Sequence, residues 1–382
     1  MSTLWPLAVL VLIVVALLAA NRQPALEPIF RWLPVPLWCY MLPMAAVTLG
    51  WLPGGHPVYR ALTYSLLPFA LGLLLMGMDL PSVIRTGPRI LVATACGSMS
   101  IVLGAPLVAW GLQRSLPPDA WKGVGTLAAT WTGGSMNLLA LRTLLQTPDA
   151  IFAPLIIVDA VIAYTWMALL VGIASRQAAI DRWLRAIPLD TSAAPDAQAD
   201  MRPITSRDGA LCVLYALGLT LGAQALARWL PATFLVSSQS GWTVLLVTTF
   251  ALLASLLTSV RQLGRNAPAL GYPCLYLVLA GVGAQASFSA LWAAPMWIAL
   301  GAGIAFVHGI SMLVTGRVLR LPLGVLATAS QANLGGVVST PLVGAVYEQR
   351  LVPVGLLLAI GCNAVGTYLG LLSATVCRWL LH

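Results

Sequence analysis

The sequence predicts an all-α polytopic membrane protein with two inverted repeats, each holding five transmembrane helices and one re-entrant or broken Gly-Gly hairpin. Three observations predict this fold: an apolar composition, a series of long apolar runs, and a glycine pair that recurs in both halves. Of the 382 residues, 59% are hydrophobic and 8% are charged, and the mean hydropathy is +0.91. Such a chain has too little polar surface to cover a soluble globule.

The charge balance does not indicate a nucleic-acid partner. The net charge is +9, but the 20 basic residues are scattered singly between apolar runs and form no basic stripe or nucleic-acid motif. They are better read as signals of membrane topology. The six cysteines lie in or beside apolar runs and form no CxxC pair, so we expect small packing residues and neither disulfides nor metal ligands.

Apolar runs of membrane length divide the chain into twelve segments. These are residues 4–20, 35–52, 61–80, 89–112, 121–145, 151–174, 209–230, 240–259, 267–286, 292–315, 323–345 and 353–377. The first run has no basic residue ahead of it, so we expect a membrane helix and no signal peptide. Residues 175–208 are the one long polar stretch and are predicted to be a cytoplasmic linker.

The two halves resemble each other, which predicts a first repeat at residues 1–174 and a second at 209–382. Gly133 of "TWTGGSMN" pairs with Gly335 of "ASQANLGGVVST" at an offset of 202. Asp159 is followed five positions later by Tyr164, and Asn363 by Tyr368, both at an offset of 204. The alternative is coincidence among glycine-rich membrane helices.

Basic residues test whether every run crosses the membrane. Twelve crossings make the halves parallel and divide the basic residues 13 to 7, whereas ten crossings with hairpins in runs five and eleven make the halves inverted and divide them 14 to 6. The counts do not separate the two models. The hairpin model puts the linker in the cytoplasm and both termini in the periplasm of a bacterial inner membrane.

Each glycine pair interrupts an apolar run and is flanked by hydrogen-bonding side chains. Non-helical backbone survives at membrane depth only where protein or a water-filled cavity covers it, and there free N–H groups bind anions and free carbonyls bind cations. Close helix packing is the alternative for either pair. The predicted solute-binding residues are Thr130, Thr132, Gly133, Gly134, Ser135, Asn137, Ser330, Gln331, Asn333, Gly335, Gly336 and Ser339.

Asp159 lies near the middle of run six, where an ionised carboxylate costs at least roughly 2.5–3.5 kcal/mol unless it is paired or hydrated. It is therefore predicted to bind sodium or to carry a proton, with Asn363 as its uncharged counterpart. Tyr164 and Tyr368 are predicted to add hydroxyl contacts, with core packing as the alternative. Sodium at Asp159 and Asn363 is the only cofactor expected. His308, in run ten, is more readily explained by a hydrogen bond to a neighbouring helix than by a proton relay.

These motifs carry a resemblance. "TWTGGSMN", "APLIIVDAVIAYTWMALL", "ASQANLGG" and "NAVGTYLG" resemble a family of bacterial and plant membrane proteins known as domain of unknown function 819. That family is similar to the superfamily of cation:proton antiporters and anion transporters, and its layout is similar to the sodium:glutamate symporter and the 2-hydroxycarboxylate transporters.

The resemblance implies inverted five-crossing repeats with glycine-rich re-entrant hairpins, and an elevator mechanism in which a transport domain slides against a scaffold domain. Gly133, Gly134, Gly335 and Gly336 would then mark the hairpin tips, and the protein would be a homodimer. The chain departs from those carriers in having no arginine within a hairpin, because Arg142 lies more than one turn past the break. Beyond the glycine pairs no residue matches those carriers, so their substrates do not transfer to this chain.

The predicted function is secondary active transport, coupled to sodium or protons, of a small carboxylate-bearing solute such as an amino acid, a dipeptide or an organic acid. An ion channel is the first alternative, since it would share the broken helices. An intramembrane enzyme is the second, and it would require Ser135 and His308 to meet as nucleophile and base. The expected partners are the solute, the coupling ion, the lipid bilayer and a second copy of the chain.

Overall fold

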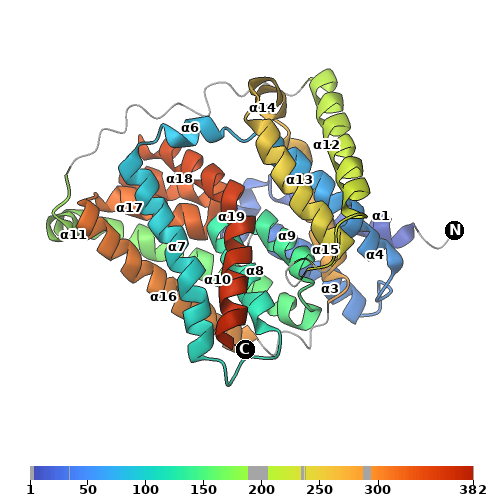
Figure 1. Cartoon of the computed structure of the whole chain (residues 1–382), viewed down its shortest axis with the longest axis horizontal. Coiled ribbons are helices and arrows are strands. Elements are labelled where there is room, and N and C mark those ends of the chain that lie inside the picture. The colour runs from blue at the N-terminus through green and yellow to red at the C-terminus, as the bar shows by residue number, and fades with distance from the viewer. Residues whose placement is uncertain are drawn as a thin grey trace. The chain divides into compact units, whose positions relative to one another are not determined.

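The computed structural model describes residues 4–33, 35–187, 205–233, 236, 238–286 and 294–381, and within these ranges every regular element is helical (Figure 1). The prediction of an all-α chain is confirmed. The helices are α1 (Trp5–Ala20), α2 (Glu27–Trp32), α3 (Val35–Thr48), α4 (Pro57–Ala61), α5 (Leu67–Met76), α6 (Leu80–Ile84), α7 (Pro88–Gly111), α8 (Ala120–Gly133), α9 (Ser135–Leu145), α10 (Asp149–Gly172), α11 (Gln177–Leu184), α12 (Ser206–Ala227), α13 (Gln239–Ser255), α14 (Thr258–Gly264), α15 (Pro268–Gly283), α16 (Ala294–Leu319), α17 (Leu323–Leu334), α18 (Gly336–Tyr347) and α19 (Leu351–Leu381). Two 3-10 segments, η1 (Pro24–Leu26) and η3 (Ile173–Arg176), and a π-helical segment, η2 (Leu62–Leu66), complete the described elements.

The helices are long and apolar enough for an integral membrane protein. Among the described residues, six helical stretches meet the length and hydropathy of a membrane span, and the number rises to eight if each of two bent helix pairs is one span. The bent pairs turn by 94° between α1 and α2 and by 109° between α13 and α14. The predicted number of ten crossings remains a prediction.

Every predicted apolar run corresponds to one helix or to a pair of consecutive helices, with shifted ends. Run three was expected at 61–80, but the helix ends at Met76. A Cβ on the next residue, Gly77, would overlap the Gly264 carbonyl. The chain therefore turns there because two glycine backbones pack directly against each other.

The chain forms two compact units, and each draws segments from both halves of the sequence. The first unit comprises residues 1–77, 142–160 and 203–297, and the second comprises 78–141, 161–202 and 298–382. α9, α10 and α16 pass from one unit into the other.

The first unit is built around α5, which packs against α12, α13 and α15, while α15 also packs against α3. Its described core includes Leu73, Met76, Cys212 and Ala216. Gly283 lets α15 approach α3, because a side chain there would overlap the Tyr40 backbone.

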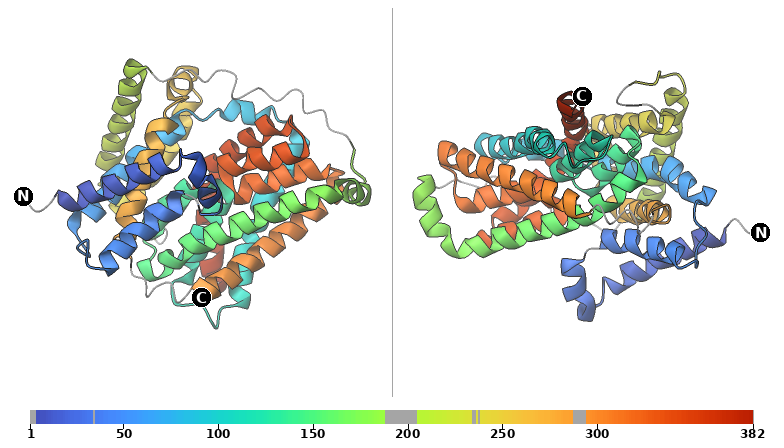
Figure 2. Two further views of the ribbon diagram at one scale, coloured as in Figure 1. Left: turned by 180° about the vertical axis from the view of Figure 1, so that it is seen from behind. Right: turned by 90° about the horizontal axis from the view of Figure 1, so that it is seen from below.

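The second unit is built around α19, which packs against α7, α8, α17 and α18, as its red ribbon shows in Figure 1. Apolar side chains of α7, α16, α17 and α19 form its largest described core. The second half of α10 lies along α16 (Figure 2). The Trp166 ring on α10 packs so closely on Gly309 of α16 that a Cβ on this glycine would lie 2.7 Å from the ring. This unit contains both predicted glycine breaks.

The beginning of the predicted linker is held against the second unit. Residues 177–184 form α11, and Asp181 accepts a hydrogen bond of 2.6 Å from the backbone amide of Leu323, the first residue of α17. Ile187 donates its amide to the Arg320 carbonyl at 2.9 Å. Residues 188–204 of the linker lie outside the described residues.

Candidate functional site

The first glycine pair forms the tip of a helical hairpin. α8 ends at Gly133, α9 begins at Ser135, and Gly134 between them has a φ of +75°. This backbone angle is costly for a residue with a Cβ and ordinary for glycine. The Gly134 amide still donates to the Thr130 carbonyl at 2.5 Å, so the last turn of α8 closes before the chain reverses.

The packing of α8 and α9 on α19 shows that the chain returns after this tip. A Cβ on Gly133 would lie 2.6 Å from the Gly366 Cα, and a Cβ on Gly125 would lie 3.0 Å from the Gly370 carbonyl. α8 therefore runs antiparallel to α19 with the two backbones in direct contact. Leu141, in α9, also packs against Gly370. Since Gly125 and Leu141 meet the same residue of α19, α9 folds back beside α8.

The second glycine pair forms a matching hairpin. α17 and α18 are separated at Gly335, and Gly336 has a φ of +79°. A Cβ on Gly324, near the start of α17, would lie 2.9 Å from the Cβ of Tyr347, the last residue of α18. The two ends of the hairpin therefore meet. Gly336 follows Gly134 at the offset of 202 found in the sequence, and both have the same unusual backbone angle.

The first arm of the second hairpin, α17, runs parallel to α19. A Cβ on Gly324 would lie 3.2 Å from the Leu351 side chain, at the first residue of α19. One turn further along, Thr328 would lie 3.0 Å from a Cβ on Gly355. α17 thus starts beside the N-terminal end of α19, whereas α8 starts beside the C-terminal part of α19.

The two hairpins meet at neighbouring residues of α19. The Cys362 thiol donates to Asn333 Oδ1 at 3.8 Å, just before the second tip. Asn363 Oδ1 lies 3.0 Å from the position of a Cβ on Gly134, at the first tip. Glycine breaks separated by 202 residues therefore converge from opposite ends of one helix, as the repeat predicts. Their depth in a bilayer remains a prediction.

Asn137 attaches the first tip to α19. Its Nδ2 donates to the Gly133 carbonyl at 2.5 Å and to the Asn363 carbonyl at 3.1 Å. Its Oδ1 accepts the Thr367 hydroxyl at 2.5 Å. Asn137 is 3% exposed, so these bonds form away from solvent and replace those that the amide would make with water.

Asn333 attaches the second tip to α7 in a similar way. Its Oδ1 accepts the Ser98 hydroxyl at 2.5 Å, and its Nδ2 donates to the Thr94 carbonyl at 3.3 Å and the Ala329 carbonyl at 3.1 Å. Sequence reasoning missed Ser98 and Thr94, because a polar residue inside an apolar helix does not reveal which helix it faces.

His308 supports the same hairpin from α16. Its Nε2 lies 2.8 Å from the Ser330 hydroxyl, and its Nδ1 lies 2.9 Å from the Ser100 hydroxyl. Ser100 donates to the Gly97 carbonyl at 2.6 Å, so Nδ1 carries a proton and Nε2 accepts from Ser330. Trp166 Nε1 donates to Ser330 at 2.9 Å. The interpretation of His308 as a residue bonded to neighbouring helices is confirmed.

Two buried amide oxygens near the tips have no hydrogen-bond partner among the described residues. They are Asn363 Oδ1, on α19, and Gln331 Oε1, on α17, and these residues are 6% and 1% exposed. The Gln331 amide nitrogen donates to the Ser339 hydroxyl at 2.9 Å. Leaving a buried acceptor unpaired costs about 1–3 kcal/mol. The site therefore offers two oxygens to a hydrogen-bond donor or a cation.

The other predicted solute-binding residues differ in their solvent exposure. Thr130, Thr132, Gly133 and Gly336 are buried, Gly134, Ser135, Gly335 and Ser339 are half-buried, and Ser330 is buried against His308. Thr132 uses its hydroxyl within α8, donating to the Ala128 carbonyl at 2.7 Å.

The predicted roles of Asp159, Tyr164 and Tyr368 remain predictions. Tyr368 lies on an exposed face of α19, whereas Thr367 faces Asn137. Asp159 and Tyr164 are half-buried on α10, and α10 passes between units so that Asp159 belongs to the first unit and Tyr164 to the second. Within the described residues, no group of three His, Cys, Asp or Glu side chains is placed to hold a metal ion.

Comparison with known proteins shows a similarity to a protein family and to a curated protein. A family model described as "Protein of unknown function (DUF819)" matches residues 8–380. The chain is 22% identical over 348 residues to a Bacillus subtilis (strain 168) protein described as "Uncharacterized membrane protein YjcL", and the match covers 86% of both chains.

Proposed function

Because the chain belongs to the DUF819 family of membrane proteins, we propose that it is a secondary active transporter. The proposed solute is small and carries a carboxylate, as an amino acid, a dipeptide or an organic acid does, and the driving force is a sodium or proton gradient. The observation that supports this function best is the convergence of two glycine-tipped hairpins from opposite ends of α19. Paired broken helices that meet at one place are typical of transporter binding sites.

The tips offer the chemistry that such a site needs. The backbone leaves the helical path at Gly134 and Gly336, where α9 and α18 begin, and the first N–H groups of a helix have no intrahelical partner and are available to a ligand. The unpartnered oxygens of Asn363 and Gln331 suit a sodium ion, which prefers oxygen ligands, or the donor groups of a solute.

Asp159 is the proposed coupling carboxylate. It is half-buried on an apolar helix, where a charge is costly and therefore functional by default. In this proposal sodium or a proton neutralises the Asp159 carboxylate.

The proposed mechanism is of the elevator type. The second unit, which holds both hairpin tips, is the proposed transport domain, and the first unit is the proposed scaffold. The similar positive φ angles at Gly134 and Gly336, together with opposite hairpin directions along α19, support inverted repeats. We further propose a homodimer in a bacterial inner membrane, with a cytoplasmic linker and periplasmic termini.

The alternatives predict different behaviour. A channel would conduct down a gradient without accumulating its solute. An intramembrane enzyme would need Ser135 beside His308, but the ring nitrogens of His308 are bonded to Ser330 and Ser100. Nothing in the site favours the enzyme.

A binding screen tests the proposal. Thermal unfolding of the purified protein is measured with amino acids, dipeptides and organic acids, each with and without sodium and at two pH values. A coupled carrier gives a stabilising solute whose affinity changes with the ion, because linkage is reciprocal. Asn363→Ala should weaken this ion dependence, whereas Ser175→Ala, which removes an exposed hydroxyl bonded to Gly172, serves as the control. Stabilisation by no solute of these classes would count against a carrier of carboxylate-bearing solutes.

A further inference from the structure

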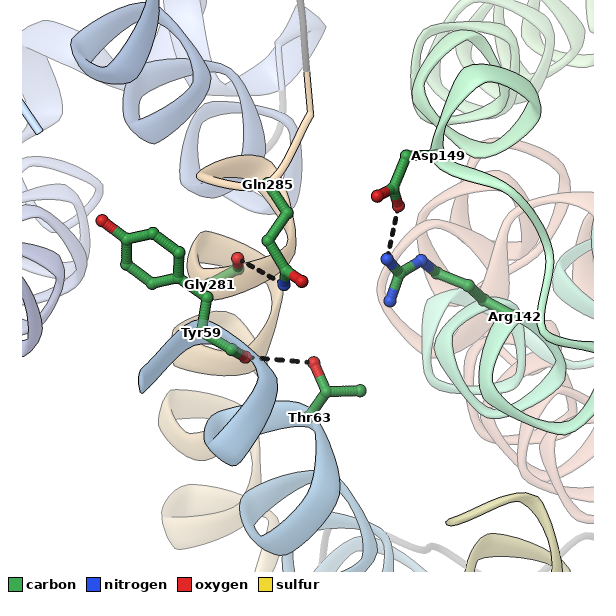
Figure 3. Close-up of polar contacts among 6 residues, drawn as sticks. All are labelled: Tyr59, Thr63, Arg142, Asp149, Gly281 and Gln285. Atoms are coloured by element: carbon green, nitrogen blue, oxygen red, sulfur yellow. Dashed lines mark hydrogen bonds and ion pairs between the residues drawn. The ribbon is translucent and has the colours of Figure 1, made fainter. Parts of the chain in front are cut away.

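The first unit contains a second group of polar side chains, which we call the Arg142 cluster: Tyr40, Thr63, Arg142, Asp149 and Gln285. Its centre is an ion pair in which Arg142 Nη2 lies 2.6 Å from Asp149 Oδ1 (Figure 3). The Arg142 side chain is 12% exposed and the Asp149 side chain is 44% exposed. The pair joins the end of α9 to the start of α10, so part of its role is structural.

The ion pair does not use all of the hydrogen-bonding groups around it. Arg142 Nε is buried and has no partner among the described residues, and the same is true of the hydroxyl of Tyr40. Both side chains pack on Phe152: the Arg142 Cζ lies 5.0 Å from its ring centroid, and the Tyr40 ring lies 6.3 Å away at an angle of 68°. The cluster therefore presents two unsatisfied donors beside one cation.

Acceptors face this cation from the other side. In Figure 3 the side-chain amide of Gln285 lies on the side that faces the Arg142–Asp149 pair, whereas the Thr63 hydroxyl is directed to the Tyr59 carbonyl. The Gln285 amide nitrogen is occupied, because it donates to the Gly281 carbonyl at 3.0 Å, which leaves its Oε1 directed toward Arg142. The Thr63 hydroxyl donates to the Tyr59 carbonyl at 3.4 Å, so its lone pairs are available as acceptors.

Two local features place these acceptors there. Thr63 lies in the π-helical segment η2, a rare conformation that is frequent at functional sites. A Cβ on Gly281 would lie 2.9 Å from the Leu62 side chain and 3.5 Å from the Tyr59 carbonyl, so the glycine lets η2 approach α15. A purely structural ion pair would require neither feature.

We propose that the Arg142 cluster binds the charged groups of an amino-acid zwitterion. The carboxylate of the ligand accepts from Arg142 Nε and the Tyr40 hydroxyl, and its ammonium group donates to the exposed Asp149 carboxylate and Gln285 Oε1. An ion pair is neutral overall, so it matches a ligand that is also neutral overall but carries both charges. An organic acid would leave the acceptors unpaired. The cluster belongs to the first unit, whereas the proposed solute site at the hairpin tips belongs to the second, so the inference is a further binding site and does not depend on which solute is transported.

Binding to the full-length purified protein tests the inference without requiring transport. Each of the twenty standard amino acids is titrated in thermal-unfolding experiments, and any that stabilises the protein is compared with its methyl ester, which lacks the anion, and its N-acetyl derivative, which lacks the cation. The test variant combines Arg142→Gln with Asp149→Asn, which removes both charges together. The control combines Lys122→Gln with Asp119→Asn at an ion pair of 3.2 Å in the second unit.

At least one amino acid is expected to stabilise the wild type and the control, with its ester and N-acetyl derivative binding at least tenfold more weakly. The test variant should lose at least tenfold in affinity. Equal binding of the N-acetyl derivative, an unchanged affinity in a folded test variant, or no binding of any amino acid would overturn the inference. If the test variant does not fold, Tyr40→Phe takes its place, because it removes one proposed donor, keeps the ring on Phe152, and should also lose affinity. Amino-acid binding without gradient-driven accumulation would overturn the proposed function and leave this site intact.

Discussion

Gly366→Ala should destabilise the protein, although glycine-to-alanine changes inside helices usually stabilise. The usual gain is about 0.4–1 kcal/mol, because alanine restricts the unfolded chain and favours the helix. At Gly366, however, the new Cβ would lie 2.6 Å from the Gly133 Cα and 2.8 Å from Asn137 Nδ2. Carbon atoms pack at about 3.5–4.0 Å, so α8 must move about 1 Å away from α19. Overpacking of this kind costs about 1–3 kcal/mol, which exceeds the usual gain.

The matched control is Gly218→Ala on α12, where a Cβ would meet no heavy atom within 4 Å. Thermal unfolding in one detergent is compared for the wild type and both variants. The midpoint should fall by a few degrees for Gly366→Ala, since about 1 kcal/mol corresponds to roughly 2–4 °C in domains of 150–250 residues. It should stay level or rise for Gly218→Ala. If the two variants unfold at the same temperature, the first hairpin does not pack backbone to backbone on α19.

Four further outcomes follow from the same geometry. Gly134→Ala and Gly55→Ala both force alanine into a positive φ, at a cost of about 1–2 kcal/mol. Only Gly134→Ala, at the first tip, should lose solute uptake. Equal losses in both variants would show that backbone strain alone explains the effect. Asn137→Leu leaves buried carbonyls and a hydroxyl unpaired and should lower the free energy of unfolding by about 1–3 kcal/mol, which denaturant titration measures; an unchanged value would contradict the network at the tip. Asp159→Asn should fold, bind solute without ion dependence and fail to accumulate it, whereas normal accumulation would remove Asp159 from coupling. In a background without the native cysteines, Arg185→Cys should react with an impermeant maleimide only from the cytoplasmic side, and labelling from the periplasm would reverse the predicted topology.

The helical framework could be predicted because its causes are local. Apolar runs of sufficient length form helices in a membrane, and the glycine pairs mark where the backbone leaves the helical path. Gly134 and Gly336 are the residues with positive φ at the two tips, and both were identified from the sequence. The ends of the helices were less predictable. Run three stops early because Gly77 packs against Gly264, a contact between residues far apart in the chain.

The partners of the tips could not be predicted, because helix rotation is set by packing. Thr367 gave no signal in the sequence, yet its hydroxyl donates to Asn137 at the first tip, whereas the contacts expected of Tyr368 remain a prediction. Ser98 gave no signal, since serine is common in membrane helices and bonds across them only in certain orientations. His308 was interpreted correctly as bonded, yet its position beside the second hairpin required the structure.

Accumulation in proteoliposomes tests the central claim, that the two hairpin tips form the solute site of an ion-driven carrier. The solute is the one that binds best in the thermal-unfolding screen, and it is present at equal concentration on both sides at the start. An imposed sodium or proton gradient should concentrate it inside wild-type vesicles, an ionophore should abolish the effect, and Gly134→Ala should reduce it strongly while Gly55→Ala does not. Flux that only equalises concentrations, or accumulation that survives Gly134→Ala unchanged, would contradict the claim.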